Sequence, residues 1–266
     1  MSHENPLSEA EVRSRMRVLT RRSFAVGAVA AVAGAAGFIW VKGSETAGGV
    51  PWPLRKMFGL NERLGRAVFS DDRLSATFPS ERAAGPGAMR TNGAIGMGGP
   101  VDPAWSMEVA SDDGRPRRFD LNEVRAVPRT SMVVELKCIE GWSEIFSWAG
   151  TSLSDFMKRY RLGTRSGAAP DPRRNPDDLY PYVALETPDR GYYVGLDMAS
   201  AMHPQTLLCY EMAGEALTPE HGAPLRLAIP VKYGIKNIKR IGRIRFTDER
   251  PADYWAERGY DWYSGH

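Results

Sequence analysis

Residues 134–148 read VELKCIEGWSEIFSW, in which an apolar, strand-like run ends at Cys138 and is followed within four residues by Glu140 and Trp142. Cys138 is one of only two cysteines in the chain. Free cysteines are among the most buried residue types, so packing is the first interpretation of this thiol. Three others stay open at this point: a disulfide with Cys209, a catalytic nucleophile, and a soft ligand for a transition metal.

The composition excludes several classes of protein. The chain has 266 residues and a formal net charge of +3, and it is long enough to bury one sizeable core. Its basic excess is concentrated near the N-terminus rather than spread over a folded face, which argues against nucleic-acid binding. No CxxC or CxxCH spacing occurs, so neither a c-type haem nor a cysteine-rich zinc site is expected.

The N-terminus carries an export or anchoring signal. Residues 20–41 read TRRSFAVGAVAAVAGAAGFIWV, about twenty uncharged residues behind a basic segment, which is enough to cross a bilayer. Paired Arg21 and Arg22 before a mildly apolar stretch resemble a twin-arginine signal, and an ordinary anchor is the alternative. We therefore expect residues 1–42 to be a signal or membrane anchor. The rest would lie in the periplasm or on the outer face of the inner membrane, and cleavage stays undecided.

The exported part divides into two regions. Residues 43–87 are rich in Gly, Pro and Arg, and we expect them to be a linker and an irregular wrapping segment. Residues 88–266 are predicted to form one β-rich α+β domain. Strands are expected at 105–110, 131–138, 182–187, 192–196, 207–212, 225–230 and 243–246. Short helices are expected to begin after Asp120, Ser152 and Asp197.

A basic segment follows in the second half of this domain, at residues 221–241. It contains Arg226, Lys232, Lys236, Lys239 and Arg240. Such a charge run is usually a solvated face. The functional alternative is a cradle for phosphate groups and a heterocycle, with cationic side chains on the phosphate oxygens and backbone amides closing in at glycines.

Two segments resemble a known family. KCIEGWSEIFSWAGTSL (137–153) is similar to the molybdenum-ligand segment of the sulfite-oxidase-fold molybdopterin oxidoreductases. AMHPQTLLCYEMAGEALTPEHGAPLRLAIPVKYGIKNIKRIGRIRFTDERP (201–251) is similar to the half of that domain that binds the cofactor phosphate. The resemblance covers about residues 88–255 and is strongest to the bacterial exported branch that includes the catalytic subunit of periplasmic methionine-sulfoxide reductase.

The resemblance implies a set of site residues. Cys138 would be the thiolate ligand of molybdenum beside the dithiolene of a molybdopterin cofactor. The cofactor itself would contact Asn92, Thr187, His221, Arg226, Asn237, Ile238 and Lys239. Glu140 and Trp142 are expected to support the site rather than to act as acid or base.

The resemblance also implies a function, an exported molybdenum-pterin oxidoreductase that transfers an oxygen atom in a two-electron step. Reduction of a small sulfoxide or N-oxide is favoured over sulfite-type oxidation. Electrons would pass through a separate electron-transfer protein, for which a haem membrane subunit is a candidate. The alternative is a catalytically silent cofactor-binding or accessory subunit of a membrane redox complex. Substrate, reaction direction and oligomeric state stay open.

Overall fold

A computed structural model describes residues 9–47, 49–70, 73–112 and 114–266. The chain forms two compact units, residues 1–57 and 58–266, whose boundary falls inside a helix. Each unit is described by itself below.

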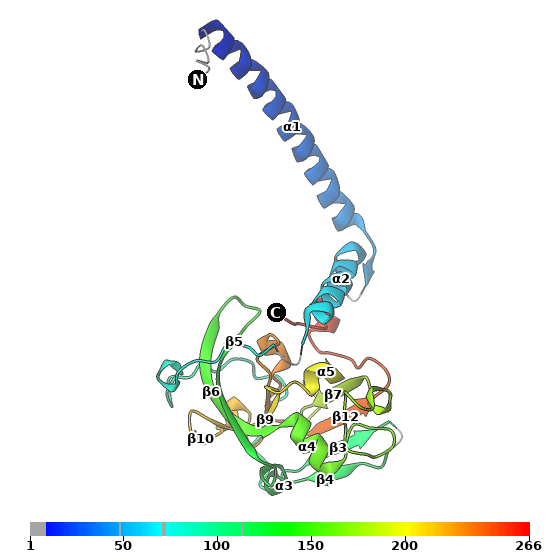
Figure 1. The fold of residues 1–266 in the computed structure, drawn as a ribbon. Helices are drawn as coiled ribbons and strands as arrows, with labels where there is room; N and C mark the ends of the chain where they lie inside the picture. The colour runs from blue at the N-terminus through cyan, green and yellow to red at the C-terminus, as the bar shows by residue number, and fades with distance from the viewer. Residues whose placement is uncertain (1–8, 48, 71–72, 113) are drawn as a thin grey trace, which may run out of the picture. The chain divides into compact units, whose positions relative to one another are not determined.

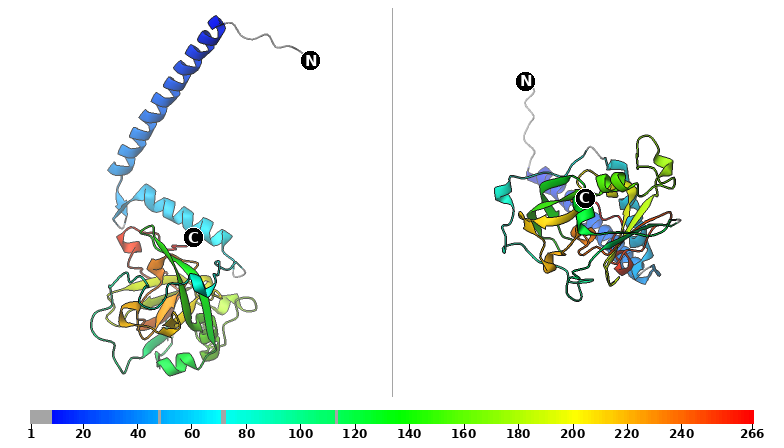
Figure 2. Two further views of the ribbon diagram at one scale, coloured as in Figure 1. Left: turned by 90° about the vertical axis from the view of Figure 1, so that its left-hand side faces the viewer. Right: turned by 90° about the horizontal axis from the view of Figure 1, so that it is seen from below.

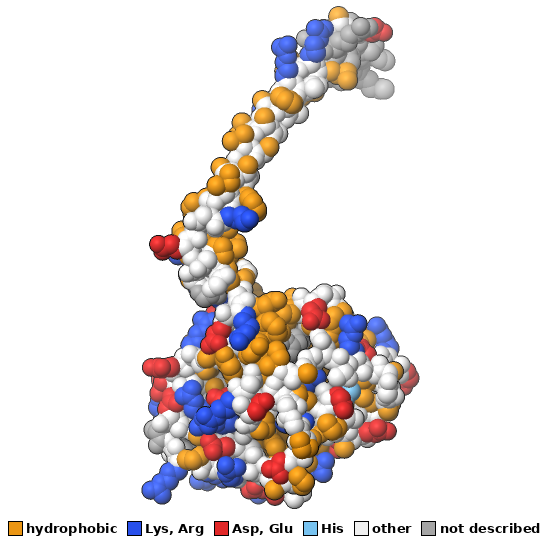
Figure 3. Space-filling view, turned by 180° about the vertical axis from the view of Figure 1, so that it is seen from behind, with side chains coloured by type: hydrophobic (Ala, Val, Ile, Leu, Met, Phe, Trp, Pro, Cys, Tyr) orange, Lys and Arg blue, Asp and Glu red, His pale blue; other side chains and the backbone are white. Residues whose placement is uncertain are grey.

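The smaller unit is dominated by one long helix. Helix α1 (Glu9–Gly43) is followed by a two-stranded hairpin, β1 (Thr46–Ala47) and β2 (Val50–Pro51). Within α1, Met16–Gly43 is long and apolar enough to cross a membrane. Figure 3 shows hydrophobic side chains along α1 and basic ones at its N-terminal end. The predicted N-terminal apolar helix is confirmed, and a signal sequence and a retained anchor share these properties.

The expectation of irregular structure across residues 43–87 was wrong in one place. Helix α2 (Trp52–Val68) occupies 17 residues of that segment. Gly59 and Gly65 interrupt its apolar pattern and lower its helix propensity. Pro53 falls in the first turn, where a missing N–H costs nothing. These residues are why the sequence of a helix was interpreted as a linker.

Two five-stranded sheets form the larger unit. Their strands are β3 (Met107–Ser111), β4 (Arg117–Phe119), β5 (Arg129–Lys137), β6 (Ser143–Ser152), β7 (Tyr182–Glu186), β8 (Tyr193–Asp197), β9 (Leu207–Met212), β10 (Glu215–Ala216), β11 (Arg226–Ala228) and β12 (Arg243–Thr247). One sheet is antiparallel, in the order β10-β9-β6-β5 with β11 also paired to β9. The other has the order β4-β3-β12-β7-β8, with β3 and β12 parallel. The long β5–β6 hairpin curves along the first sheet (Figures 1 and 2).

The short helices begin where the capping residues predict. Asp120, Ser152 and Asp197 each accept a hydrogen bond from the backbone N–H three residues later. They open α3 (Leu121–Arg125), α4 (Leu153–Tyr160) and α5 (Met198–Ala201). Single-turn 3₁₀ helices are η1 (Ser80–Arg82), η2 (Pro176–Asp178), η3 (Pro219–His221), η4 (Gly234–Lys236) and η5 (Ala256–Arg258). The predicted α+β class is confirmed.

Strand β9 separates two hydrophobic cores because its side chains alternate between the faces of the sheet. Leu208 and Tyr210 join the larger core, which includes residues of β3, β7, β8 and β12. Leu207 and Cys209 face the smaller core on the opposite side, together with Trp148 of β6. Cys209 is thus a packed core thiol, and the structure joins neither cysteine in a disulfide. The pocket described below opens on the side of the smaller core.

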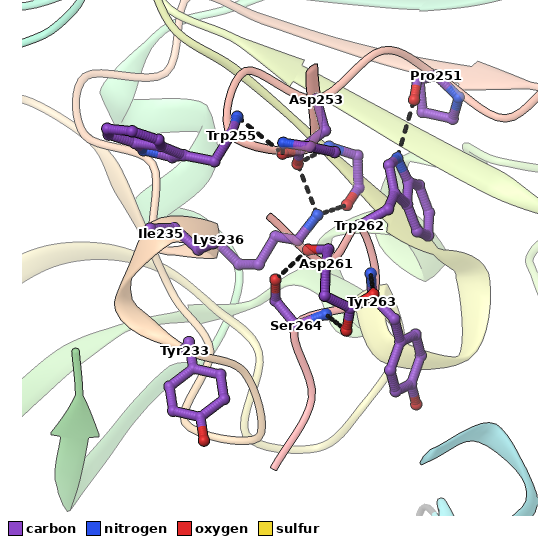
Figure 4. A network of polar contacts seen from close by, with 12 residues as sticks. Tyr233, Ile235, Lys236, Pro251, Asp253, Trp255, Asp261, Trp262, Tyr263 and Ser264 are labelled. Atoms are coloured by element: carbon purple, nitrogen blue, oxygen red, sulfur yellow. Dashed lines mark hydrogen bonds and ion pairs between the residues drawn. The ribbon is translucent and has the colours of Figure 1, made fainter. Parts of the chain in front are cut away.

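A buried ion pair fastens the C-terminal segment to η4 (Figure 4). Lys236 Nζ lies 2.6 Å from the Asp253 carboxylate and donates a second hydrogen bond, of 2.8 Å, to the Gly195 carbonyl. Both side chains of the pair are almost fully buried. The same carboxylate accepts the backbone N–H groups of Trp255 and Ala256. The ion pair therefore fixes the start of the segment that carries Trp255 to the pocket.

We predict that Asp253→Asn lowers the free energy of unfolding by about 3–5 kcal/mol, because it leaves the Lys236 ammonium buried without a counter-charge. Urea unfolding of the cofactor-free protein measures this. The matched control is Lys158→Ala, which removes an exposed pair with Asp155 and should cost less than about 1 kcal/mol. Equal effects of the two substitutions would contradict the role given to the buried pair.

Candidate active site

Cys138 lies in the tight loop of the β5–β6 hairpin. Its backbone N–H donates to the Trp142 carbonyl at 2.9 Å, and its carbonyl accepts from Gly141 N–H at 3.1 Å. Gly141 has φ +88°, which side-chain-bearing residues rarely adopt, so glycine permits the reversal. The last strand pair, Lys137 with Ser143, stands directly beside this loop. The thiol is thereby held at the end of a rigid hairpin.

A small polar network surrounds the thiol. Asn92 Nδ2 lies 3.9 Å from Cys138 Sγ and donates to the Glu140 carboxylate at 3.2 Å. Trp142 Nε1 donates to the same carboxylate at 2.9 Å, and the Arg90 guanidinium stacks 4.6 Å from the Trp142 ring centroid. The hydrogen bonds from Trp142 and Asn92 lower the pKa of Glu140. Glu140 is therefore ionised and holds its two donors in place, which agrees with the supporting role expected for it and for Trp142.

The thiol opens into a pocket with a cavity volume of about 200 Å³. Leu136, Phe146, Trp148 and Met212 form an apolar wall on the side of the smaller core. Burial raises the pKa of the Cys138 thiol, and the nearby Glu140 carboxylate adds to this shift. A bound metal cation would therefore have to displace the thiol proton.

Arg226 is the most unusual residue of the pocket. The residue is 4% exposed, and its guanidinium stacks on Trp148 at 4.6 Å and donates to the backbone carbonyls of His221 and Asn237. No carboxylate pairs with it among the residues that the structure describes. Burial lowers the pKa of Arg226 to about 10, so it is still charged at neutral pH. A buried cation held only by carbonyls calls for an anionic ligand.

His221 and Lys239 extend this electropositive region. His221 Nδ1 lies 2.9 Å from the Thr218 hydroxyl, while its buried Nε2 has no hydrogen-bond partner. Burial, followed by the charges of Arg226 and Lys239, lowers the pKa of His221. Lys239 Nζ donates to the carbonyls of Gly93 and Glu220, and burial lowers its pKa to about 8.

Six of the eight residues expected at the site line this one pocket. They are Asn92, Cys138, His221, Arg226, Asn237 and Lys239. The Asn237 side chain accepts from Ile229 N–H and donates to the Tyr233 carbonyl, so it also holds the loop that carries Lys239.

The other two residues lie elsewhere. Thr187 is buried against Gly96 and lines a separate hollow with Asp189 and Arg240. The Ile238 side chain is fully buried in the larger core, and its backbone carbonyl accepts from Leu227 N–H. A cofactor role for either residue stays a prediction.

The basic segment 221–241 is not a solvated face, because most of its five cations are buried and they lie in different places. Lys236 is used in the buried ion pair, Lys232 is buried against the Tyr263 ring, and Arg240 donates to the Gly99 carbonyl. Of its five predicted cations, Arg226 and Lys239 reach the pocket. The remaining cations stabilise the fold.

No motif in the sequence indicates that several aromatic residues belong to the pocket. Tyr192, Trp255 and Tyr260 line it from β8's preceding turn and from the C-terminal segment. The Tyr192 hydroxyl donates to the Ile235 carbonyl at 2.5 Å. Only the tertiary fold brings these residues together, so periodicity and motif spacing could not have placed them.

These observations test whether the residues fit a molybdopterin. The pocket holds a soft thiol at one part. At another part it holds a buried arginine and a buried histidine nitrogen, for which the described residues supply no carboxylate and no hydrogen-bond partner respectively. No cluster of three or more His, Cys, Asp or Glu side chains able to hold a metal occurs in the described part of the chain. Cys138 would then supply a single protein bond, with the other metal ligands coming from the pterin, and the cationic groups would face its anionic groups. The residues fit.

The fold and the site together define a molybdopterin-dependent oxidoreductase. Residues 97–255 match the oxidoreductase molybdopterin binding domain, and the chain belongs to that family. Both the enzyme class and the cofactor expected from the sequence are thereby confirmed.

Individual relatives show which members of the family the chain is similar to. The chain is 34% identical over 154 residues to the protein-methionine-sulfoxide reductase catalytic subunit of Xanthomonas campestris, covering 58% of this chain and 48% of the relative. It is 34% identical over 175 residues to that of Campylobacter jejuni, covering 60% and 56%. The chain thus spans about half the length of these relatives. Among solved structures, the sulfane dehydrogenase of Paracoccus pantotrophus matches with a TM-score of 0.45 and 19% identity, over 55% of this chain and 39% of that one.

We predict that Arg226→Gln lowers the molybdenum and pterin content per folded chain by roughly 10–100-fold, the range by which supporting residues change metal affinity. The physical reason is loss of the buried cation that faces the ligand. Elemental analysis and fluorescence of the released, oxidised pterin measure it. Arg174→Gln, at a side chain 90% exposed in a loop, is the control and should keep full content. Full cofactor content in the Arg226 variant would refute the assignment.

Proposed function

We propose that the protein is an exported reductase that removes the oxygen atom from a small sulfoxide or N-oxide. The observation that carries the proposal is a hairpin-held thiol, Cys138, in the same pocket as a buried cation, Arg226, that pairs with no carboxylate in the described part of the chain. The names of the two methionine-sulfoxide reductase relatives support a sulfoxide as substrate. The balanced reaction consumes a sulfoxide, two electrons and two protons, and it yields a thioether and water.

Different residues of the pocket would bind different parts of the cofactor and of the substrate. A molybdenum-pterin group bound here would supply two-electron oxygen-atom transfer. Cys138 would lose its proton on binding the metal, Arg226 and Lys239 would bind anionic groups of the pterin, and His221 Nε2 would provide a hydrogen-bonding atom. The apolar wall that includes Trp148 excludes water from that side. The aromatic rings of Trp142, Trp255 and Tyr260 offer apolar surface to the organic part of a substrate.

We predict that the molybdenum-loaded protein, given dithionite-reduced viologen, converts methionine sulfoxide or trimethylamine N-oxide to the reduced product. Cys138→Ser should lower this rate by more than about a hundredfold, since even residues that only orient metal ligands are worth roughly 10–100-fold. Cys209→Ala is the matched thiol control and should stay active, because Cys209 is a core residue. Full cofactor with no turnover on any acceptor would instead identify a silent accessory subunit.

Export by the twin-arginine route, with electrons supplied by a separate protein such as a haem membrane subunit, completes the proposal. Its support is Arg21 and Arg22 at the basic end of α1, directly before the apolar stretch. The twin-arginine route carries folded proteins, which suits a cofactor inserted before export. The protein would then work in the periplasm or on the outer face of the inner membrane.

We predict that joint substitution of Arg21→Lys and Arg22→Lys keeps the folded protein in the cytoplasm. Cell fractionation with an immunoblot of both compartments measures this. Arg17→Lys, also basic but outside the pair, is the control and should leave export intact. Unchanged export of the double variant would exclude the twin-arginine route and favour an ordinary anchor.

A further inference from the structure

The part of α2 that belongs to the larger unit packs there with its polar side. Glu62 lies 2.6 Å from the Arg250 guanidinium, and Arg66 lies 3.7 Å from the Asp197 carboxylate. Gly65 allows close approach, since a Cβ there would meet the Tyr263 ring at 2.8 Å. A helix on a water-soluble surface normally does the reverse and buries its apolar stripe.

The apolar stripe of α2 is instead exposed. It consists of Leu54, Met57, Leu60, Leu64 and Val68, whose side chains recur at intervals of three and four residues. Their exposed fractions are 43%, 50%, 38%, 57% and 61%. None of the 17 residues of α2 is buried. An apolar face of this kind, continuous along the helix, marks an interaction surface.

The start of α2 lies beside the end of the candidate membrane span. Trp52 N–H donates to the Glu45 carbonyl at 2.9 Å, because the β1–β2 hairpin folds the chain back. The rings of Trp40 and Trp52 meet edge to face, with centroids 5.7 Å apart. Lys56 lies 4.6 Å from the Trp52 ring centroid. Tryptophan beside lysine is the composition typical of a membrane–water interface.

We propose that the apolar face of α2 lies in the surface of the phospholipid bilayer that α1 enters. The α1–α2 connection places the first turn of α2 at the level of Trp40, near the end of the span. Lys56 lies next to Met57 at the edge of the apolar stripe, where its charge faces anionic headgroups. This proposal concerns membrane attachment and is independent of the reaction at Cys138.

The test uses the full chain reconstituted into vesicles of phosphatidylethanolamine and phosphatidylglycerol. A benzophenone amino acid replaces Leu64 in one variant and Met57 in a second, both exposed and outside the pocket. The matched control carries it at Arg63, on the polar side. A melting temperature equal to that of the wild type shows that each variant is folded. After irradiation, mass spectrometry measures phospholipid adducts on the labelled peptide.

The proposal predicts at least several-fold more lipid adduct at positions 64 and 57 than at 63. Equal adduct at all three positions, or none at any, overturns it. Crosslinking of position 64 to a second copy of the chain also overturns it, because that result makes the apolar face a dimer interface. The same variants are also irradiated in native membranes. Crosslinking to another protein in place of lipid there refutes the lipid assignment.

Discussion

The site depends on one constraint, a buried guanidinium with no counter-charge among the described residues. Arg226 is enclosed by the ring of Trp148 and by the carbonyls of His221 and Asn237, and burial alone would disfavour its charge. Such an arrangement is costly unless an anion completes it. Burial, with the charge of Arg226 as the second cause, lowers the pKa of His221 and Lys239. An anionic cofactor would supply a counter-charge to all of these groups at once. We therefore interpret the pocket as a binding site rather than as a packing defect.

The fold brings this region to Cys138 through strand β9. The β5–β6 hairpin, which ends in the thiol, pairs with β9 on one side, and β11, which begins at Arg226, pairs with it on the other. Two segments far apart in the sequence therefore reach one pocket through shared hydrogen-bonded strands. The Lys236–Asp253 pair anchors the C-terminal segment, and this segment brings Trp255 to the pocket. The Cys138 thiol, the buried Arg226 and the aromatic surface are each fixed by a different part of the chain.

Local signals in the sequence predicted the local structure well. Asp120, Ser152 and Asp197 begin helices because each side chain caps a backbone N–H, and β9 was placed at its observed bounds from its apolar composition. Long-range placement could not be read in the same way. Nothing in the spacing showed that Lys236 would pair with Asp253, that Trp255 and Tyr260 would reach the pocket, or that Thr187 would line another hollow. Helix α2 was not predicted from the sequence, because its apolar stripe faces outward and its glycines are typical of a linker.

The central claim is that Cys138 is the protein's bond to molybdenum. X-ray absorption at the molybdenum edge tests this most directly, since it counts sulfur neighbours of the metal without requiring a known substrate. The account predicts one more sulfur ligand in the wild-type protein than in a Cys138→Ser variant that retains metal, and no difference between wild type and Cys209→Ala. An unchanged sulfur count in the Cys138 variant, or a folded wild-type protein without molybdenum from a molybdenum-replete host, would contradict it.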